Sequence, residues 1–131
     1  MNGKILVVDD EADIRLLLRM ELEERGFTVP EAGNGPEGIE RFKAEHPDLV
    51  IADLRMSGMD GLAMIREMRK LDDMAQFIIL TGYASIESVL QCIHQNLVYD
   101  YLVKPLSNME DFIYTVQRAI EKRRLIIEKN S

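Results

Sequence analysis

Charged and hydroxyl side chains come directly after four short apolar runs of this chain. Asp9 and Asp10 follow the first run, and Asp53, Thr81 and Lys104 each follow a later one. Three carboxylates in one crevice repel one another, so they need a cation or partial protonation. Oxygen ligands at a shallow site favour Mg²⁺. A carboxylate beside such a metal, with a lysine and a hydroxyl opposite, has the composition that phosphoryl transfer to a carboxylate would use.

These residues meet only if the apolar runs are parallel strands of one sheet. The expected strands are residues 5–8, 27–31, 49–52, 77–80 and 101–103. The expected helices cover about 12–25, 36–45, 61–70, 85–95 and 109 to near the C-terminus. This alternation predicts right-handed crossovers and a doubly wound α/β fold with helices on both faces. The ligand crevice of such a fold lies beyond the carboxyl ends of the strands.

Single residues predict the ends and faces of these elements. Gly26 is expected to stop the first helix. Pro30 lacks a backbone donor, which places its strand at a sheet edge. Asp60 is expected to cap the helix that Gly61 opens. The helix residues expected to face the core include Ile14, Leu17, Leu18, Leu22, Ile39, Phe42, Val89 and Ile93.

The amino-acid composition limits the cellular compartment and the kinds of partner that we expect for this protein. Sixteen basic and 23 acidic residues give a net charge of −7, which argues against direct nucleic-acid binding. A single cysteine, Cys92, excludes an internal disulfide and fits a reducing cytoplasm. No apolar run approaches the roughly 20 residues of a membrane span. We therefore expect a cytoplasmic domain with no membrane partner.

Five motifs stand, in order, at the predicted strand ends and the loops after them. They are Lys4-Ile5-Leu6-Val7-Val8-Asp9-Asp10-Glu11, Asp53-Leu54-Arg55-Met56, Met59-Asp60-Gly61-Leu62, Thr81-Gly82-Tyr83-Ala84 and Asp100-Tyr101-Leu102-Val103-Lys104-Pro105. Together they resemble the signatures of the receiver domain of two-component response regulators, over about residues 4–122. The resemblance implies a flavodoxin-like, five-stranded parallel sheet in the order 2-1-3-4-5. We predict a receiver domain at 1–122 and a helix extension or linker at 123–131.

The resemblance also implies an acceptor site. Asp53 would take a phosphoryl group from a phosphohistidine of a sensor histidine kinase or a histidine phosphotransfer protein. Asp9, Asp10, Asp53 and the backbone carbonyl of Arg55 would hold Mg²⁺, and Lys104 would pair with the phosphoryl oxygens. Such a domain is a signalling acceptor, with self-catalysed phosphotransfer and slow autodephosphorylation, rather than a metabolic enzyme.

The remaining implied roles concern switching. Thr81 would move toward the phosphoryl group and Tyr101 would change rotamer with it, which would control an output. Arg55 and Tyr83 would tune hydrolysis of the acyl phosphate. The peptide bond between Lys104 and Pro105 is cis in the family.

The sequence departs from the family pattern in two loops. Ser57 stands where the family often has proline. Residues 93–99 replace the usual small-residue turn, and there Asn96 is expected to supply a left-handed helix stop. Beyond Ile120, apolar residues return at 125–127, which predicts a homodimer or an output contact through the fourth helix, the fifth strand and the last helix.

Other interpretations of the same residues remain open at this point. The acids after the first strand could merely cap the next helix, and Thr81, Tyr101 and Lys104 could be ordinary strand-end residues. A flavodoxin-like cofactor module would need a glycine- and hydroxyl-rich first loop instead of acids. An aspartyl-phosphate hydrolase would have an acid where Arg55 stands. A phosphate-independent interaction module would not need the intact acid set.

Overall fold

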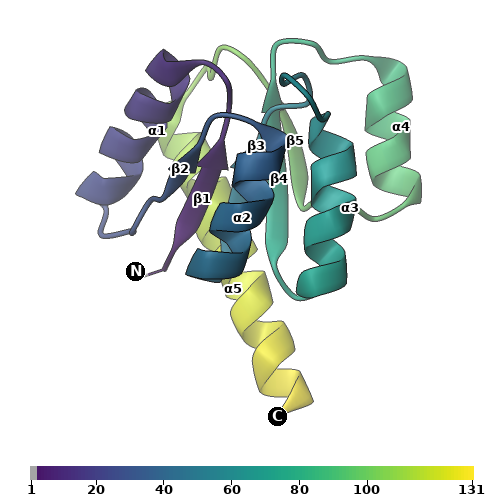
Figure 1. Cartoon of the computed structure of the whole chain (residues 1–131). Helices are drawn as coiled ribbons and strands as arrows, with labels where there is room; N and C mark the ends of the chain where they lie inside the picture. The colour runs from purple at the N-terminus through teal and green to yellow at the C-terminus, as the bar shows by residue number, and fades with distance from the viewer. Residues whose placement is uncertain (1–2) are drawn as a thin grey trace.

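Five parallel strands form the centre of the computed structural model, which describes residues 3–131 (Figure 1). They lie in the order β2-β1-β3-β4-β5, as the doubly wound, flavodoxin-like prediction requires, so the predicted fold is confirmed. Met1 and Asn2, which fall within the predicted domain 1–122, lie outside the described residues. The strands are β1 (Ile5–Val8), β2 (Glu31–Ala32), β3 (Leu49–Ala52), β4 (Gln76–Thr81) and β5 (Asp100–Val103).

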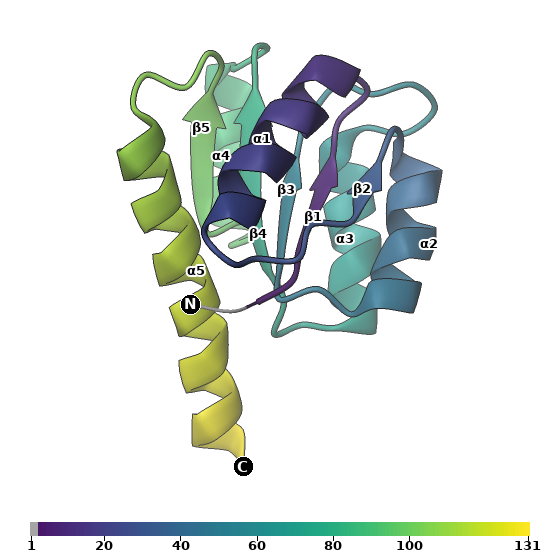
Figure 2. The ribbon, with the colours of Figure 1, turned by 90° about the vertical axis from the view of Figure 1, so that its left-hand side faces the viewer.

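Helices cover both faces of this sheet. Figure 2 shows α1 and α5 against one face, with α2, α3 and α4 against the other. The helices are α1 (Ala12–Glu24), α2 (Gly35–Glu45), α3 (Gly61–Leu71), α4 (Ile86–His94) and α5 (Met109–Asn130).

Alternate residues of the central strands build two separate core layers. In β1, Leu6 and Val8 pack with α2 and α3, whereas Ile5 and Val7 pack with α1 and α5. Every residue of β1, β3 and β4 is buried, because helices cover these strands on both sides. The uninterrupted apolar runs of the sequence reflect this double coverage.

The edge strand β2 is shorter than predicted. Its expected range was 27–31, but only Glu31–Ala32 form a regular strand, and Thr28 makes an isolated bridge to Lys4. Pro30 can accept a hydrogen bond, from Val7 N at 3.0 Å, but it has no N–H to donate. The predicted edge position is confirmed.

Two of the residues predicted to face the core are exposed. Leu17 is 45% exposed and Ile93 is 66% exposed, while Leu18 and Cys92 are buried on the same helices. The prediction for Leu17 and Ile93 was therefore wrong. The sheet covers only a narrow stripe of each helix. Within these two helices, the buried residues are Leu18 and Leu22 of α1 and Cys92 of α4.

The helix ends follow local chemistry. Asp60 caps α3 by accepting the Ala63 N–H at 2.8 Å, as predicted. Asn96 adopts the left-handed conformation, with φ of 50°, as predicted for a helix stop without glycine. His46, predicted only as a surface residue, ends α2 in the same conformation.

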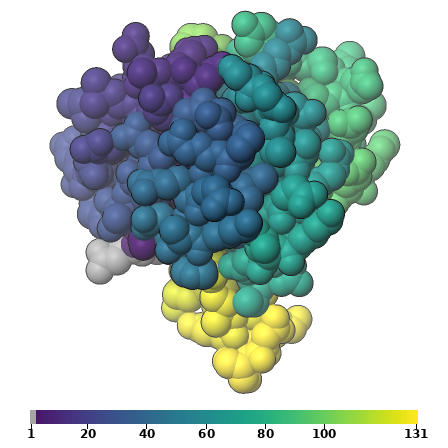
Figure 3. Space-filling model, in the orientation of Figure 1, coloured from purple at the N-terminus to yellow at the C-terminus, as the bar shows by residue number. Residues whose placement is uncertain are grey.

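The last helix continues beyond the sheet. Figure 3 shows its yellow C-terminal part projecting from the body of the molecule. Ile120 is the last buried residue of α5, and Arg123 lies at the base of the projection, 3.1 Å from Asp72 and 3.8 Å from Asp48. Among residues 3–131, no helix combines the length and apolar character that crossing a membrane requires.

Candidate functional site

Four carboxylates gather at the carboxyl ends of β1 and β3. Each of Asp9, Asp10, Glu11 and Asp53 offers one oxygen, and these oxygens lie within 4.8 Å of one another. Asp9 and Asp53 are buried, whereas Asp10 and Glu11 are exposed. The two loops meet because β1 and β3 are neighbouring parallel strands. A surface pocket at this point is lined by Asp10, Glu11, Asp53, Arg55, Met56 and Tyr83.

Lys104 joins the two buried carboxylates. It follows β5, two strands away from β3, and its Nζ lies 2.8 Å from both Asp9 Oδ2 and Asp53 Oδ2. Glu11 Oε1 lies 3.6 Å from the same nitrogen. The peptide bond between Lys104 and Pro105 is cis. Three acids from two loops thus share one ammonium group.

This arrangement shifts the pKa values of two members in the same direction. Burial alone would lower the pKa of Lys104, but hydrogen bonds to Asp53 and Asp9 outweigh it and hold the pKa above its ordinary value. Burial raises the pKa of Asp9, against hydrogen bonds from Lys104 and the Glu11 N–H, and the charge of Asp53 raises it further. Lys104 therefore stays charged, but its charge does not fully offset the effects of burial and of the nearby Asp53 on the pKa of Asp9.

The donor set fits a hard divalent cation. The four groups present carboxylate oxygens, which Mg²⁺ prefers, and the exposed Asp10 and Glu11 leave the cluster open to solvent on one side. A cation there would also offset the repulsion between Asp9 and Asp53, which adds to the effect of burial on the pKa of Asp9. The residues present are thus compatible with Mg²⁺.

Backbone contacts hold Asp53 in place. The Arg55 N–H donates to Asp53 Oδ1 at 3.3 Å. The Gly61 N–H donates to the Leu54 carbonyl at 2.8 Å, and a Cβ atom at position 61 would collide with the carbonyl oxygen of Asp53. Glycine is therefore required where α3 begins, because the helix packs directly on the backbone of the acid.

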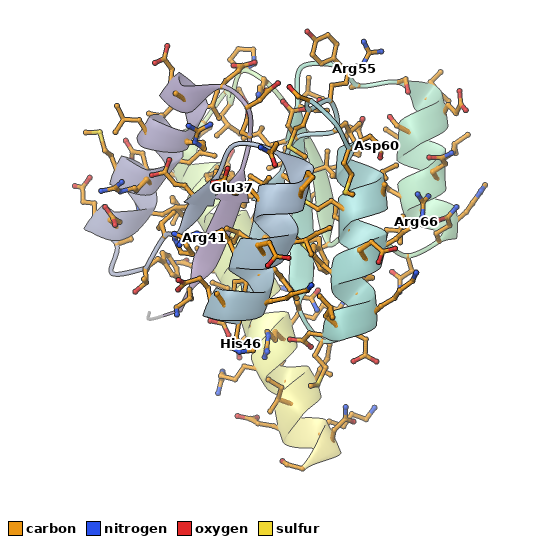
Figure 4. All side chains as sticks on the ribbon, in the orientation of Figure 1. Glu37, Arg41, His46, Arg55, Asp60 and Arg66 are labelled. Carbon is orange, nitrogen blue, oxygen red and sulfur yellow. The ribbon has the colours of Figure 1, made fainter. Side chains whose placement is uncertain are left out.

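Two side chains form one wall of the pocket. The guanidinium of Arg55 lies 4.5 Å from the centre of the Tyr83 ring, in a cation–π contact. Figure 4 labels Arg55 above the N-terminus of α3, where Asp60 lies. The buried Thr81 accepts the Tyr83 N–H at 3.1 Å through Oγ1, so it is tied to this wall. Arg55, Tyr83 and Thr81 were all singled out in the sequence.

Tyr101 points toward α4. Its hydroxyl lies 2.7 Å from Ser88 Oγ, and its ring packs against the core on the α3 side of the sheet. Ser88 also forms a capping box with Ser85 at the start of α4. Sequence reasoning missed Ser88, although Ser85 is a good capping residue before an apolar run and Ser88 stands three residues later, where a capping box has its second partner.

The structure thus brings together the residues that the sequence selected. Asp9, Asp10, Asp53 and Lys104 form one cluster. Thr81 adjoins it from β4, where its backbone carbonyl accepts the Lys104 N–H at 2.8 Å. Arg15 was also missed in the sequence, although its guanidinium contacts the loop that carries the first two acids.

Comparison with known proteins gives an independent view of this site. A family model described as "Response regulator receiver domain" matches residues 5–117. The "C4-dicarboxylate transport transcriptional regulatory protein DctD" of Rhizobium meliloti (strain 1021) is 36% identical over 127 residues, which cover 97% of this chain and 27% of that protein. "Sporulation initiation phosphotransferase F" of Bacillus subtilis (strain 168) is 36% identical over 89 residues, which cover 68% of this chain and 72% of that protein.

Solved structures show the same similarity. The response regulator protein TrrA from Thermotoga maritima, in complex with Mg(2+)-BeF, superposes with a TM-score of 0.79 and 38% identity. The match covers 88% of this chain and 97% of TrrA. The chain spans about a quarter of the length of the first curated relatives it matches.

Proposed function

Since this chain belongs to the family of response-regulator receiver domains of two-component systems, we propose that its phosphoryl acceptor is Asp53. One observation carries this assignment. Asp53 is the buried acid that both contacts Lys104, at 2.8 Å, and lines the pocket open to solvent. Asp9 shares the lysine but is not among the residues that line this pocket.

The transfer uses groups that are already in contact. An oxygen of the Asp53 carboxylate attacks the phosphorus of a phosphohistidine, and the bond between phosphorus and the donor's imidazole nitrogen breaks with its electron pair on nitrogen. Lys104 moves its hydrogen bond from Asp53 Oδ2 to an oxygen of the transferred group. Thr81 Oγ1 accepts the Tyr83 N–H, so its own hydroxyl proton is free to donate to the same group.

Mg²⁺ is the proposed cofactor, held by Asp9, Asp10, Asp53 and the backbone carbonyl of Arg55. When bound, it would neutralise negative charge on the transferring phosphoryl group. The oxygen ligands of the acid cluster support this assignment, as does the Mg(2+)-BeF named in the TrrA complex.

The other assigned roles follow the same geometry. Arg55 and Tyr83, stacked at the mouth of the pocket, would tune how fast water removes the phosphoryl group. Thr81 and Tyr101 would carry the switch, and the phosphoryl donor would be a sensor histidine kinase or a histidine phosphotransfer protein. The domain would act in the cytoplasm, which suits the free thiol of Cys92, and its net charge of −7 disfavours nucleic acid as a direct partner.

Intact mass spectrometry tests the function. With Mg²⁺ and acetyl phosphate, the chain should gain the mass of one phosphoryl group, and chelation of Mg²⁺ should prevent the gain. Turnover of a phosphomonoester without a lasting adduct would instead support the hydrolase alternative.

Replacing Asp10 by asparagine should weaken Mg²⁺ binding by about tenfold or more, since even indirect partners of a metal change its affinity by roughly 10–100-fold. Without metal, the variant should be as stable as the parent or more so, because one charge leaves a crowded cluster. Calorimetric titration and thermal unfolding measure the two effects. Asp13→Asn is the matched control, because Asp13 is an exposed acid of the first turn of α1 outside the cluster. Equal Mg²⁺ affinity in the Asp10 variant and the parent would remove Asp10 from the ligands.

An output surface is proposed on α4, β5 and α5. We propose that residues 1–122 form the receiver unit and that 123–131 extend it toward a second copy or an output module. Large apolar side chains are exposed on all three elements, as expected for a contact surface. They are Ile86, Leu90, Ile93, Val103, Tyr114, Leu125 and Ile127.

Phosphorylation should strengthen self-association through this surface. Sedimentation of the chain, with and without the phosphoryl donor, should show a larger fraction of dimer after phosphorylation. Ending the chain after Lys122 should reduce that fraction, because Leu125 and Ile127 are then lost. A monomer at high concentration in every case would leave 123–131 as a linker.

A further inference from the structure

Arg15 reaches back from α1 to the loop that carries the first two acids. Its Nη1 donates to the backbone carbonyl oxygen of Asp9 at 2.6 Å. Its Nε donates to Glu31 Oε1 at 3.2 Å. The side chain is 22% exposed, so the guanidinium is largely enclosed between these two partners. One planar group thus connects the acid loop to the edge strand β2.

Glu31 fixes the direction of this guanidinium. The backbone of Glu31 is in register with Val7 of β1, so its position is set by the sheet. Its second oxygen accepts from Arg19 Nη1 at 2.9 Å, which holds the carboxylate from the other side. The donor that reaches Asp9 is therefore anchored at its far end.

The bond from Arg15 completes the restraint of Asp9. The Asp9 N–H donates to the Ala32 carbonyl at 3.1 Å, and the Asp9 carboxylate accepts from the Glu11 N–H at 2.9 Å and from Lys104 at 2.8 Å. Arg15 holds the remaining polar group, the carbonyl. That carbonyl belongs to the planar peptide that joins Asp9 to Asp10, so its orientation restricts the directions open to the exposed Asp10 carboxylate.

We propose that Arg15 is a positioning residue for the acids that bind the metal. The proposal rests on the proposed function of the acid cluster. Arg15 would not touch the metal or the phosphoryl group. It would hold the Asp9–Asp10 peptide so that both carboxylates face one point before a cation arrives, which lowers the cost of ordering them on binding.

The direction in which Mg²⁺ affinity changes when Arg15 is removed distinguishes a positioning role from a simple charge effect. Arg15 is a cation near the acids, and a cation repels Mg²⁺. If charge were its only effect, removing it would tighten Mg²⁺ binding. If it positions the peptide, removing it weakens Mg²⁺ binding in spite of the lost repulsion.

Calorimetric titration of Mg²⁺, without any phosphoryl donor, provides this measurement. Arg15→Met should bind Mg²⁺ about tenfold more weakly than the parent, the size of effect found for groups that orient metal ligands. Arg15→Lys keeps the charge but loses the planar guanidinium that donates to Asp9 and Glu31 at once, so this variant should also bind Mg²⁺ more weakly than the parent. Arg19→Met is the matched control, because Arg19 bonds the same Glu31 without contacting Asp9. Because Glu31 keeps its place in the sheet and its bond to Arg15, this control should lose much less affinity than Arg15→Met.

Three outcomes would overturn the proposal. They are an Arg15→Met variant that binds Mg²⁺ as tightly as the parent or more tightly, an Arg15→Lys variant with the parent affinity, and an Arg19→Met control that weakens binding equally. Thermal unfolding in the presence of chelator verifies that each variant is folded. If Arg15→Met does not fold, the comparison of Arg15→Lys with the parent decides the question. A parent chain that binds no Mg²⁺ and takes up no phosphoryl group would instead refute the function itself.

Discussion

Replacing Asp53 by asparagine should abolish phosphoryl addition to this chain. The amide of asparagine has no anionic oxygen to attack phosphorus, so the acyl phosphate cannot form. The fold should persist, because the amide oxygen can still accept the Arg55 N–H that Asp53 Oδ1 accepts in the parent. Intact mass after incubation with Mg²⁺ and acetyl phosphate should show the parent with one added group and the variant with none.

Asp60→Asn is the control for this experiment. Asp60 lies on the same loop, and asparagine caps a helix as well as aspartate does, so the Ala63 contact and the labelling should both survive. Labelling of the Asp53 variant to the parent level would move the acceptor to another acid of the cluster.

Replacing Lys104 by methionine should slow phosphotransfer by roughly 10²–10³-fold, the usual loss when one donor to the developing charge is removed. The length of the side chain is retained, but the ammonium that lies 2.8 Å from both buried acids is gone. Stopped incubations followed by mass spectrometry measure the rate. A rate equal to that of the parent would mean that Lys104 only holds the acids together.

The same variant should lose about 3 kcal/mol of unfolding free energy near neutral pH, because two buried carboxylates lose their shared partner. Ionised Asp9 already costs stability, since its pKa is raised in the folded chain. That cost is absent below the ordinary pKa and grows as the pH rises through the folded value. The gap in unfolding free energy between parent and variant should therefore narrow as the pH is lowered toward about 4.

Denaturant unfolding at several pH values, in chelator, measures this gap. Lys4→Met is the control, because Lys4 pairs with Glu45 at the opposite end of β1 and at a more exposed position. The unfolding free energy of Lys4→Met should differ little from that of the parent at every pH. A difference in unfolding free energy between the parent and Lys104→Met that stays constant with pH would contradict the role of Asp9.

The sequence predicted the central sheet well because burial on both faces leaves a pattern that few other structures produce. β1 and β3 have the predicted bounds, since each is a four-residue apolar run that ends at an acid. The edge strand β2 was overestimated, because residues 27–31 read as one strand although Pro30 cannot donate to the ladder. Leu17 and Ile93 were misplaced because helical spacing shows that an apolar face exists but not how much of it the sheet covers.

The site was predictable to the level of which residues meet, and no further. Strand ends at one edge of a parallel sheet converge whatever the loops do, so Asp9, Asp53 and Lys104 could be grouped from the sequence. Their sharing of one ammonium could not, because it depends on how far Lys104 reaches across β4. Partners on helices, such as Ser88 for Tyr101, depend on the rotation of α4 relative to the sheet, which no local pattern encodes.

The ion pairs of Arg123 connect the projecting part of α5 to the starts of two neighbouring strands, β3 and β4. Asp48 directly precedes β3, and Asp72 lies in the loop before β4. Asp53 directly follows β3, and Thr81 is the last residue of β4. Each strand therefore has a residue of the proposed acceptor site at its carboxyl end and, before its amino end, an acid that pairs with Arg123 of the projecting helix. The ion pairs at the base of the projecting helix are thus separated from the proposed acceptor site by the length of these strands, about 20 Å for the six residues of β4.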